Sequence, residues 1–135
     1  MAKVNNIWAV IEANRGGEKP RAFMRVAQEA DLMIALNYYE PGYKNQFHHH
    51  WGTSQSFLVM KGELTLRTRK NADAPVEEHR LKEGECAVME RGEYYQLENA
   101  TSAPLVLYQA KQPTDKLQLL GKEPVNAREH FGDAV

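Results

Sequence analysis

Three consecutive histidines, His48, His49 and His50, are the residues best suited to chemistry in this chain, and an amide follows them at Gln55. Side chains alternate across a β-strand, so an extended segment projects His48 and His50 to one face and His49 to the other. Two imidazoles on one face supply half of a four-ligand metal site. We therefore expect His48 and His50 to point inward as metal ligands and His49 to face outward, exposed to solvent.

The elements around the histidines are predicted to be strands. Short runs of apolar, β-branched and aromatic residues recur between clusters of Gly, Pro, Asn and Asp, which is typical of an all-β sandwich or barrel. We expect strands near Ile7–Ile11, Arg21–Val26, Leu32–Tyr39, Phe47–His50, Ser56–Met60, Glu63–Arg69, Glu77–Leu81, Cys86–Met89, Tyr95–Glu98 and Leu105–Ala110. Helix propensity competes over Arg21–Asp31, where strand is favoured, and Val125–Phe131 could form one short C-terminal helix with Asn126 as its N-cap.

Two connections should place Gln55 near the histidines. Lys61-Gly62 lies between Phe57–Met60 and Glu63–Leu66, and a two-residue connection with Gly second predicts a tight turn, so these strands are expected to pair antiparallel. Upstream, residues 51–54 are expected to form a bend that returns the chain beside the histidine strand. Gln55 would then face the same interior as His48 and His50.

Composition restricts the classes of partner. A chain of 135 residues with 17 Lys and Arg against 18 Asp and Glu has the size of one domain and a formal charge of −1, so nothing indicates nucleic acid or an anionic membrane. The early apolar run Ile7–Ile11 is too short for a signal peptide or a membrane span. The lone Cys86 excludes an intramolecular disulfide, and we expect it to be a small buried side chain. A cytoplasmic location is expected.

The spacing of these residues follows a known pattern. Gly, five residues, His-x-His, four residues, an acid or amide, six residues and Gly is the first signature of the cupin family, and Gly42, His48, His50, Gln55 and Gly62 follow it. The second signature is matched at Gly84, Gly92 and Asn99, whereas Glu90 replaces its proline and Tyr95 occupies its histidine position. The chain therefore resembles a small single-domain cupin.

The resemblance implies the fold and its assembly. We expect an all-β, double-stranded β-helix of the jelly-roll barrel type, a single domain over residues 1–135 with the core barrel at about 21–112. An N-terminal strand and a C-terminal tail would flank the barrel. Cupins commonly pair through barrel faces and N-terminal strands, so a homodimer is expected, with the segment before Leu32 as the contact.

The resemblance also implies a ligand set. The usual cupin ligands are three histidines and one glutamate, and His48, His50, Gln55 and Tyr95 occupy those positions here. Replacing Glu by Gln removes an anion, which Tyr95 can restore if coordination ionises its phenol. A divalent transition metal, Zn, Fe, Ni or Mn, is then expected. The alternative is that both changes degrade the site and leave a neutral cavity without metal, with Gln55 as a hydrogen-bond partner.

Several reactions stay open for such a site. A metal with open positions favours Lewis-acid chemistry on a small oxygenated substrate, such as isomerisation, cyclisation or a lyase reaction. An iron-dependent dioxygenase and a non-catalytic small-molecule-binding barrel are the alternatives, followed by a structural barrel filled by side chains. Gln55 cannot act as a general base, so Tyr95, or Tyr94 if the register shifts by one, is the candidate for proton transfer.

Weaker candidates surround this set. The aromatic side chains of Tyr39, Phe47, Trp51 and Tyr108 could line the pocket, although core packing explains such residues equally well. One of the basic residues Arg25, Lys44, Arg67 and Arg69 could reach inward to a carboxylate or phosphate of the substrate.

Overall fold

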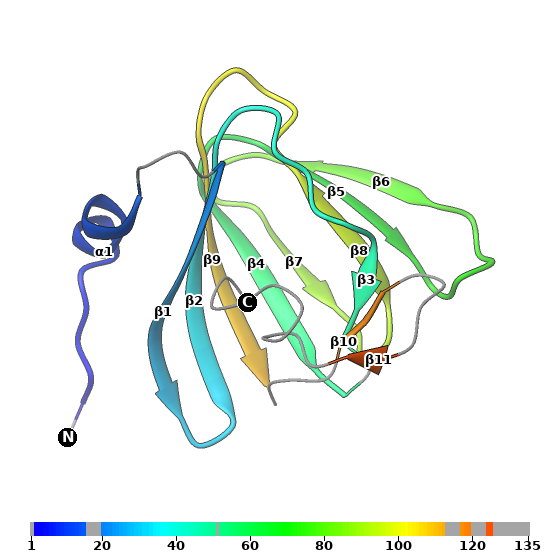
Figure 1. Cartoon of the computed structure of the whole chain (residues 1–135), viewed down its shortest axis with the longest axis horizontal. Helices are drawn as coiled ribbons and strands as arrows, with labels where there is room; N and C mark the ends of the chain where they lie inside the picture. The colour runs from blue at the N-terminus through cyan, green and yellow to red at the C-terminus, as the bar shows by residue number, and fades with distance from the viewer. Residues whose placement is uncertain (1, 16–19, 51, 113–116, 120–123, 126–135) are drawn as a thin grey trace.

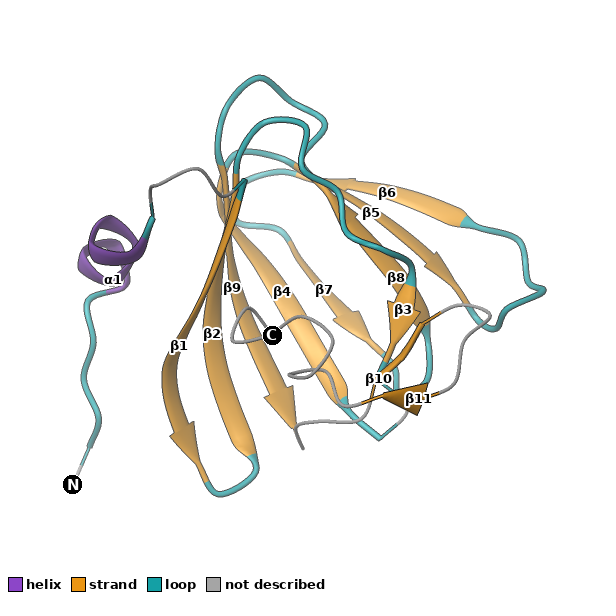
Figure 2. Ribbon diagram, in the orientation of Figure 1, coloured by secondary structure: helices purple, strands orange, loops and turns teal. Residues whose placement is uncertain are grey.

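Strands with alternating apolar side chains make up most of the structure, and one helix precedes them (Figures 1 and 2). The computed structural model describes residues 2–15, 20–50, 52–112, 117–119 and 124–125. Its elements are α1 (Ile7–Asn14), β1 (Arg21–Glu29), β2 (Leu32–Tyr39), β3 (His48–His49), β4 (Ser54–Lys61), β5 (Leu64–Arg69), β6 (Glu77–Leu81), β7 (Cys86–Met89), β8 (Tyr94–Glu98), β9 (Leu105–Gln112), β10 (Leu117–Leu119) and β11 (Pro124–Val125).

The strands form two antiparallel sheets that face one another. One has the order β1-β2-β9-β4-β7 and the other the order β11-β10-β3-β8-β5-β6, so strands distant in the sequence lie side by side in both. In Figure 1 the two sheets enclose an interior between β1, β2, β9 and β4 on one side and β3, β8 and β5 on the other. The predicted all-β jelly-roll barrel is confirmed.

Buried and partly buried side chains alternate along the strands, so each sheet turns one face toward the core. In β4 the side chains of Gln55, Phe57 and Val59 are buried, whereas those between them are only partly buried. The main core lies between the sheets and consists of Tyr39, Phe57, Val59, Leu64, Leu66, Leu81, Met89, Tyr95, Leu97, Leu105 and Leu107. Burying one such apolar side chain stabilises the fold by roughly 1.5–3 kcal/mol, so this cluster holds the two sheets together.

The expected pairing of the strands on either side of Lys61-Gly62 is wrong. β4 pairs with β7 and β9, whereas β5 pairs with β6 and β8, so the turn carries the chain from one sheet to the other. Gly62 has φ +87°, and a Cβ there would lie 2.5 Å from the carbonyl oxygen of Pro104. The glycine specifies a tight turn, but both flanking strands carry an apolar face, and these faces meet across the core instead of lying in one sheet.

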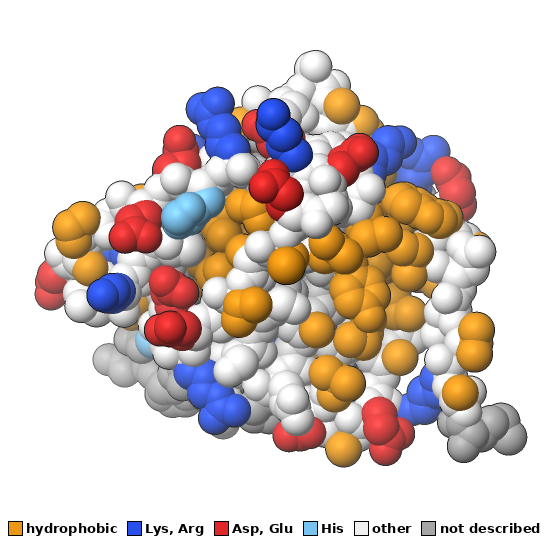
Figure 3. Space-filling view, turned by 180° about the vertical axis from the view of Figure 1, so that it is seen from behind, with side chains coloured by type: hydrophobic (Ala, Val, Ile, Leu, Met, Phe, Trp, Pro, Cys, Tyr) orange, Lys and Arg blue, Asp and Glu red, His pale blue; other side chains and the backbone are white. Residues whose placement is uncertain are grey.

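The predicted N-terminal strand at Ile7–Ile11 is also wrong, because this segment is the start of α1. Asn6 caps the helix, its side-chain oxygen accepting a hydrogen bond from Ala9 N over 3.0 Å. Ile7, Val10 and Ile11 have helical spacing and pack against a second apolar cluster on the outer face of the five-stranded sheet. Figure 3 shows hydrophobic side chains gathered over part of the molecule seen from behind.

Other expectations have different outcomes. The favoured strand at Arg21–Val26 is confirmed as the start of β1. Cys86 is exposed, not buried, because it lies on β7 at the edge of its sheet. The predicted helix at Val125–Phe131 lies outside the described residues, apart from Val125 in β11. No helix within the described ranges is long and apolar enough to cross a membrane.

The expectation that the chain returns beside the histidine strand after residues 51–54 is wrong. Trp51 lies outside the described residues, and the strand that follows, β4, belongs to the sheet opposite β3. The neighbours of β3 are β8 and β10, so the chain does not return beside the histidine strand. Gln55 nevertheless faces the same interior as the histidines, from across the barrel.

Candidate functional site

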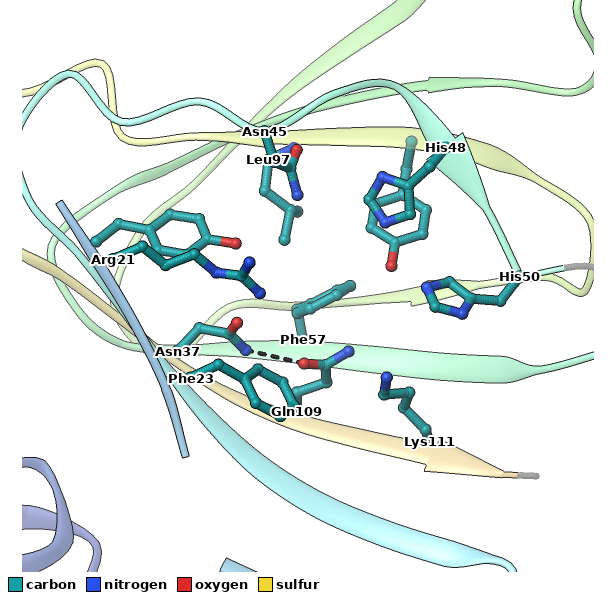
Figure 4. A pocket seen from close by; sticks show the side chains of 12 residues that line it. Arg21, Phe23, Asn37, Asn45, His48, His50, Phe57, Leu97, Gln109 and Lys111 are labelled. Atoms are coloured by element: carbon teal, nitrogen blue, oxygen red, sulfur yellow. Dashed lines mark hydrogen bonds between the residues drawn. The ribbon is translucent and has the colours of Figure 1, made fainter. Parts of the chain in front are cut away.

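A cavity between the two sheets brings together residues from both cupin-like signatures and from β1, β2 and β9. It is lined by Arg21, Phe23, Asn37, Tyr39, Asn45, His48, His50, Phe57, Tyr95, Leu97, Gln109 and Lys111, most of which are labelled in Figure 4. Its free volume of about 20 Å³ is room for about one water molecule or one ion. His48 and His50 lie at one end of the cavity in this view, and Arg21 lies at the other.

His48 is held so that one ring nitrogen keeps its lone pair. Its side chain is buried, and Nδ1 lies 2.7 Å from the carbonyl oxygen of Gln46. A carbonyl oxygen only accepts, so Nδ1 carries the proton and Nε2 carries the lone pair. Metal-binding histidines are commonly oriented by this kind of bond to a backbone carbonyl. His48 therefore has the tautomer that a ligand through Nε2 requires.

His50 is the second inward histidine, and it is neutral. Burial, followed by the nearby His48 and Lys111, lowers its pKa well below the usual 6.5. Its Nδ1 is buried and has no hydrogen-bond partner among the described residues. The rings of His48 and His50 lie 5.4 Å apart, centre to centre. Two buried imidazoles thus converge, as the period of two predicted.

Tyr95 reaches the same end of the cavity from β8, where it is paired in register with His48. Its ring centre lies 4.4 Å from that of His48 and 5.7 Å from that of Phe57. Burial raises the pKa of its phenol far above the usual 10, while a hydrogen bond with Gln55 acts in the opposite direction. The phenol therefore keeps its proton at neutral pH, and in this environment Tyr95 is a hydrogen-bond donor.

Gln55 interacts with the Tyr95 phenol but is not among the residues that line the cavity. Its Oε1 accepts a hydrogen bond from Gln109 Nε2 over 2.8 Å, and Gln109 Oε1 accepts one from Asn37 Nδ2 over 2.9 Å. Since Oε1 of Gln55 is occupied by Gln109, the amide nitrogen of Gln55 is left for the Tyr95 phenol, and this interaction lowers the phenol pKa. The chain of amides runs from Asn37 through Gln109 and Gln55 to Tyr95. This geometry favours Gln55 as a hydrogen-bond partner.

Tyr94 and His49 lie apart from the cavity. Their rings stack at 4.2 Å with an angle of 6° between the planes, and His49 Nδ1 lies 2.8 Å from the carbonyl oxygen of Gly92. His49 points away from the cavity as expected, but it is only 9% exposed, so the expectation of a solvent-exposed side chain is wrong. Tyr94 and the Gly92 carbonyl cover it. Tyr95, not Tyr94, has the register that meets His48.

The inward basic residues are Arg21 and Lys111, which sequence reasoning missed. None of the four expected candidates lines the cavity. Arg67, for example, forms ion pairs with Glu78 at 3.0 Å and Glu98 at 2.7 Å across neighbouring strands. The alternation along β9, in which Leu105, Leu107, Gln109 and Lys111 share one face, was the available signal for Lys111. Of the aromatic candidates, Tyr39 lines the cavity.

Asn99 of the second signature organises a loop. Its side-chain nitrogen donates to the carbonyl oxygens of Tyr39 over 3.1 Å and Ala103 over 2.8 Å, and its Oδ1 accepts from the backbone and hydroxyl of Thr101. Asn99 thereby ties the connection between β8 and β9 to the end of β2. The hydrogen bonds that hold this loop therefore account for Asn99 in the signature, without any contact with a ligand.

The donor set can be tested against a metal ion. No cluster of three or more His, Cys, Asp or Glu side chains that could hold an ion occurs in the described part of the chain. The two buried imidazoles, of which that of His50 has an Nδ1 that lacks a partner among the described residues, fit a transition metal as nitrogen ligands. Within the described part of the expected ligand set, the remaining candidates are the Tyr95 phenol and, if its bond to Gln109 were exchanged, the Gln55 amide.

Comparisons with known proteins agree with the fold. Residues 36–110, more than half of the chain, match the family model described as a cupin domain. TT1209 from Thermus thermophilus has a similar structure, with a TM-score of 0.71 and 20% identity over 83% of this chain and 98% of that chain. A double-stranded β-helix protein from Klebsiella pneumoniae subsp. pneumoniae gives 0.70 and 18% over 90% of this chain and 100% of that chain.

A longer relative is also similar. Recombinant oxalate oxidase in complex with glycolate has a TM-score of 0.66 and 17% identity, over 76% of this chain and 56% of that chain. This chain therefore spans little more than half the length of that protein. At such identities the likeness shows the fold alone. No curated protein matches the sequence.

Proposed function

This chain belongs to the cupin family, and on that premise we propose that it binds a divalent transition metal and acts on a small oxygenated substrate inside the barrel. The observation that carries the proposal is the convergence of the buried His48 and His50, of which His50 is neutral and has an unpartnered Nδ1. Imidazole nitrogens of this kind suit Zn, Fe, Ni or Mn. His48 and His50 would hold the ion, with Tyr95 beside them.

Such an ion, when bound, would polarise an oxygen of the substrate as a Lewis acid. The chain's own residues supply the rest. Tyr95 holds its proton at neutral pH because burial raises its pKa, so it can donate that proton, or a hydrogen bond, to a developing oxyanion. Gln55 holds the phenol in place. His48, His50 and Tyr95 are only 2–3% exposed, and removal from water strengthens interactions of this kind. Isomerisation, cyclisation and lyase reactions are the classes that need these groups.

A metal-free binding barrel is the second candidate, and one observation favours it. None of the described cavity-lining residues is acidic, so among these residues a divalent cation would find only neutral ligands unless the phenol ionised. An iron-dependent dioxygenase remains an alternative within the metal-binding class. Metal content separates the metal-binding class from the binding barrel.

The test is elemental analysis of untagged protein, before and after reconstitution with Zn, Fe, Ni or Mn. We expect close to one equivalent of metal in the wild type and in His79→Ala, because His79 lies on β6 outside the cavity. His48→Ala and His50→Ala should lose the metal while circular dichroism shows an intact fold. Full metal occupancy in both variants, or none in the wild type after reconstitution, would contradict the proposal. A wild type that takes up no metal after reconstitution would favour the binding barrel.

A further inference from the structure

The cavity between the sheets is closed too tightly to hold a substrate. Its free volume of about 20 Å³ is room for about one water molecule or one ion, whereas pockets that bind small molecules commonly measure roughly 300–1,000 Å³. The function proposed above therefore requires part of the lining to move when a substrate enters. The described lining residues differ in how firmly they are held, so they differ in how easily they can move.

Most of the lining is fixed by packing or by hydrogen bonds. Four of its side chains are 1–2% exposed and belong to the main core between the sheets: Tyr39, Phe57, Tyr95 and Leu97. Protein cores are close-packed, so displacing one of these side chains would disturb its neighbours. Asn37 donates to Gln109 over 2.9 Å, and breaking that bond would leave buried amides without partners.

Three of the described lining residues reach the solvent in part, and they mark the outer end of the cavity: Arg21, Phe23 and Asn45. Asn45 is tied to β8. Its backbone N–H donates to the carbonyl oxygen of Leu97 over 3.1 Å, and its side-chain Oδ1 accepts from Leu97 N–H over 2.8 Å. Gln96 Nε2 donates to the Asn45 carbonyl oxygen over 2.9 Å. The two β1 side chains are therefore the movable part of this end.

Phe23 is the more easily moved of the two. The guanidinium carbon of Arg21 lies over two rings, 5.7 Å from the centre of Phe23 and 5.9 Å from that of Tyr39. The Phe23 ring has no polar atom, and it belongs to neither of the two buried apolar clusters. It can therefore rotate about the bonds of its own side chain while the backbone of β1 stays paired with β2. Rotamer changes of partly exposed side chains are fast.

The Phe23 ring also adjoins the route to the histidines. Lys111 Nζ lies 5.7 Å from the centre of the Phe23 ring. In Figure 4 Lys111 lies beside His50, and its charge is close enough to contribute to the lowered pKa of that imidazole. Space vacated by the ring would therefore extend the cavity from the solvent along Lys111 toward His50.

We propose that the Phe23 side chain is the gate of this cavity and limits the size of the substrate. Its ring has to turn outward before a molecule larger than water reaches His48 and His50. The substrate then occupies the space that the ring has left, so a smaller side chain at this position admits larger molecules. The proposal rests on the function proposed above, because it names the residue that selects among small substrates.

Chemical labelling of the histidines tests the gate without a substrate. Diethyl pyrocarbonate is larger than the closed cavity; it transfers an ethoxycarbonyl group to a neutral imidazole nitrogen and releases ethanol and carbon dioxide. Metal-free protein would be labelled near neutral pH, with tandem mass spectrometry following each histidine. His79, whose side chain is 51% exposed, gives the rate of an accessible imidazole.

The wild type should protect the inward histidines. We expect His50 to react about tenfold or more slowly than His79, because the reagent modifies only the open form of the cavity. Equal rates at His50 and His79 would overturn the proposal, since the cavity would then be accessible with the ring in place.

Variants assign the protection to Phe23. Phe23→Ala should raise the labelling rate of His50 about tenfold or more, and Phe23→Leu should raise it by a smaller factor. Val26→Ala is the matched control, because it shortens an apolar side chain of the same strand that packs in the outer cluster; it should label like the wild type. An unchanged His50 rate in Phe23→Ala would overturn the gate. If that variant does not fold, Phe23→Leu decides by the same comparison.

His49 distinguishes a gate from a general loosening of the fold. It points away from the cavity, is 9% exposed and stacks on Tyr94, so unfolding would expose it together with His50. The rate at His49 should therefore stay unchanged in Phe23→Ala. Equal acceleration at His49 and His50 would show that the substitution loosens the barrel as a whole, and would also overturn the gate.

Labelling of metal-free protein keeps this test separate from that of the metal. Faster labelling of His50 in Phe23→Ala, in a protein that takes up no metal on reconstitution, would support the gate and contradict the metal. Metal uptake by the wild type, with the same His50 rate in both proteins, would do the reverse.

Discussion

Gln109 donates its side-chain amide to Oε1 of Gln55 over 2.8 Å, across the strand pair β4 and β9. Because Gln109 also accepts a hydrogen bond from Asn37, both ends of its amide are used inside the barrel. Because Gln55 Oε1 accepts from Gln109, the Gln55 amide nitrogen is left for the Tyr95 phenol. The phenol can then donate its own proton to a group in the cavity. Gln55, which is not among the residues that line the cavity, thus interacts with Tyr95, which is.

Replacing Gln109 by Leu should destabilise the protein by about 2–4 kcal/mol, because the buried amides of Asn37 and Gln55 would each lose a partner. Urea denaturation followed by circular dichroism measures the change. The control is Gln112→Leu, an exposed position on the same strand, which should change stability by less than about 0.5 kcal/mol. Equal effects of the two substitutions would show that the amide chain does not contribute to stability.

Gly62→Ala should be destabilising by about 2–4 kcal/mol. The position has φ +87°, and the added Cβ would meet the backbone oxygen of Pro104 at 2.5 Å, so the two loops that connect the sheets would have to separate. Gly52→Ala is the matched control, because a Cβ there meets nothing within 4 Å and its φ is not positive. Thermal and urea denaturation of both variants against the wild type give the comparison. A Gly62→Ala protein as stable as Gly52→Ala would contradict the steric argument.

The sequence predicted most of the strands because local signals set them. Alternation within β2, β6 and β7 and the turns between them gave the observed bounds of those strands. Local signals do not determine which strands pair, so the chain was wrongly expected to form a hairpin at Lys61-Gly62. The run at Ile7–Ile11 was short enough to suit either state, and the Asn6 cap with the spacing of Ile7, Val10 and Ile11 favours helix.

The site was predictable only where a residue's direction follows from strand register. His48 and His50 share a face because of the period of two, and Tyr95 joins them because β8 pairs with β3 in register. Arg21 and Lys111 come from strands far apart in the sequence, and their meeting depends on the order of strands in the sheet. That order is a property of the whole fold, so the presence of both basic side chains in the cavity lining could not be derived from any one segment.

The homodimer stays a prediction, and the N-terminal segment gives it a specific test. Trp8 on α1 is 46% exposed, beside the helix residues that pack on the outer face of the five-stranded sheet. Exposed apolar groups of this kind favour association. We expect light scattering after gel filtration to give twice the chain mass for the wild type and the single mass for Trp8→Lys. Val76→Lys, equally exposed at 46% but on the far connection between β5 and β6, is the control and should stay dimeric. A monomeric wild type would refute the prediction.

Alkaline pH should weaken the fold through the buried phenols of Tyr39 and Tyr95. Burial raises the pKa of Tyr39 from the usual 10 to about 12, and it raises that of Tyr95 as well. The folded state therefore holds these protons more tightly than the unfolded chain does. The stabilisation is complete below pH 10 and is lost as the pH rises from there through about 12, which for Tyr39 amounts to roughly 3 kcal/mol.

The measurement is the free energy of unfolding in urea at about pH 9 and about pH 11.5, chosen on either side of the usual phenol pKa. Comparing the wild type with Tyr39→Phe at both values cancels the contribution of lysines and other groups that titrate in both proteins. Phe has no proton to lose, so the variant should lose less stability between the two pH values than the wild type. Identical losses in the two proteins would mean that the Tyr39 phenol ionises as easily in the folded state as in the unfolded chain, which its 1% exposure among apolar neighbours argues against.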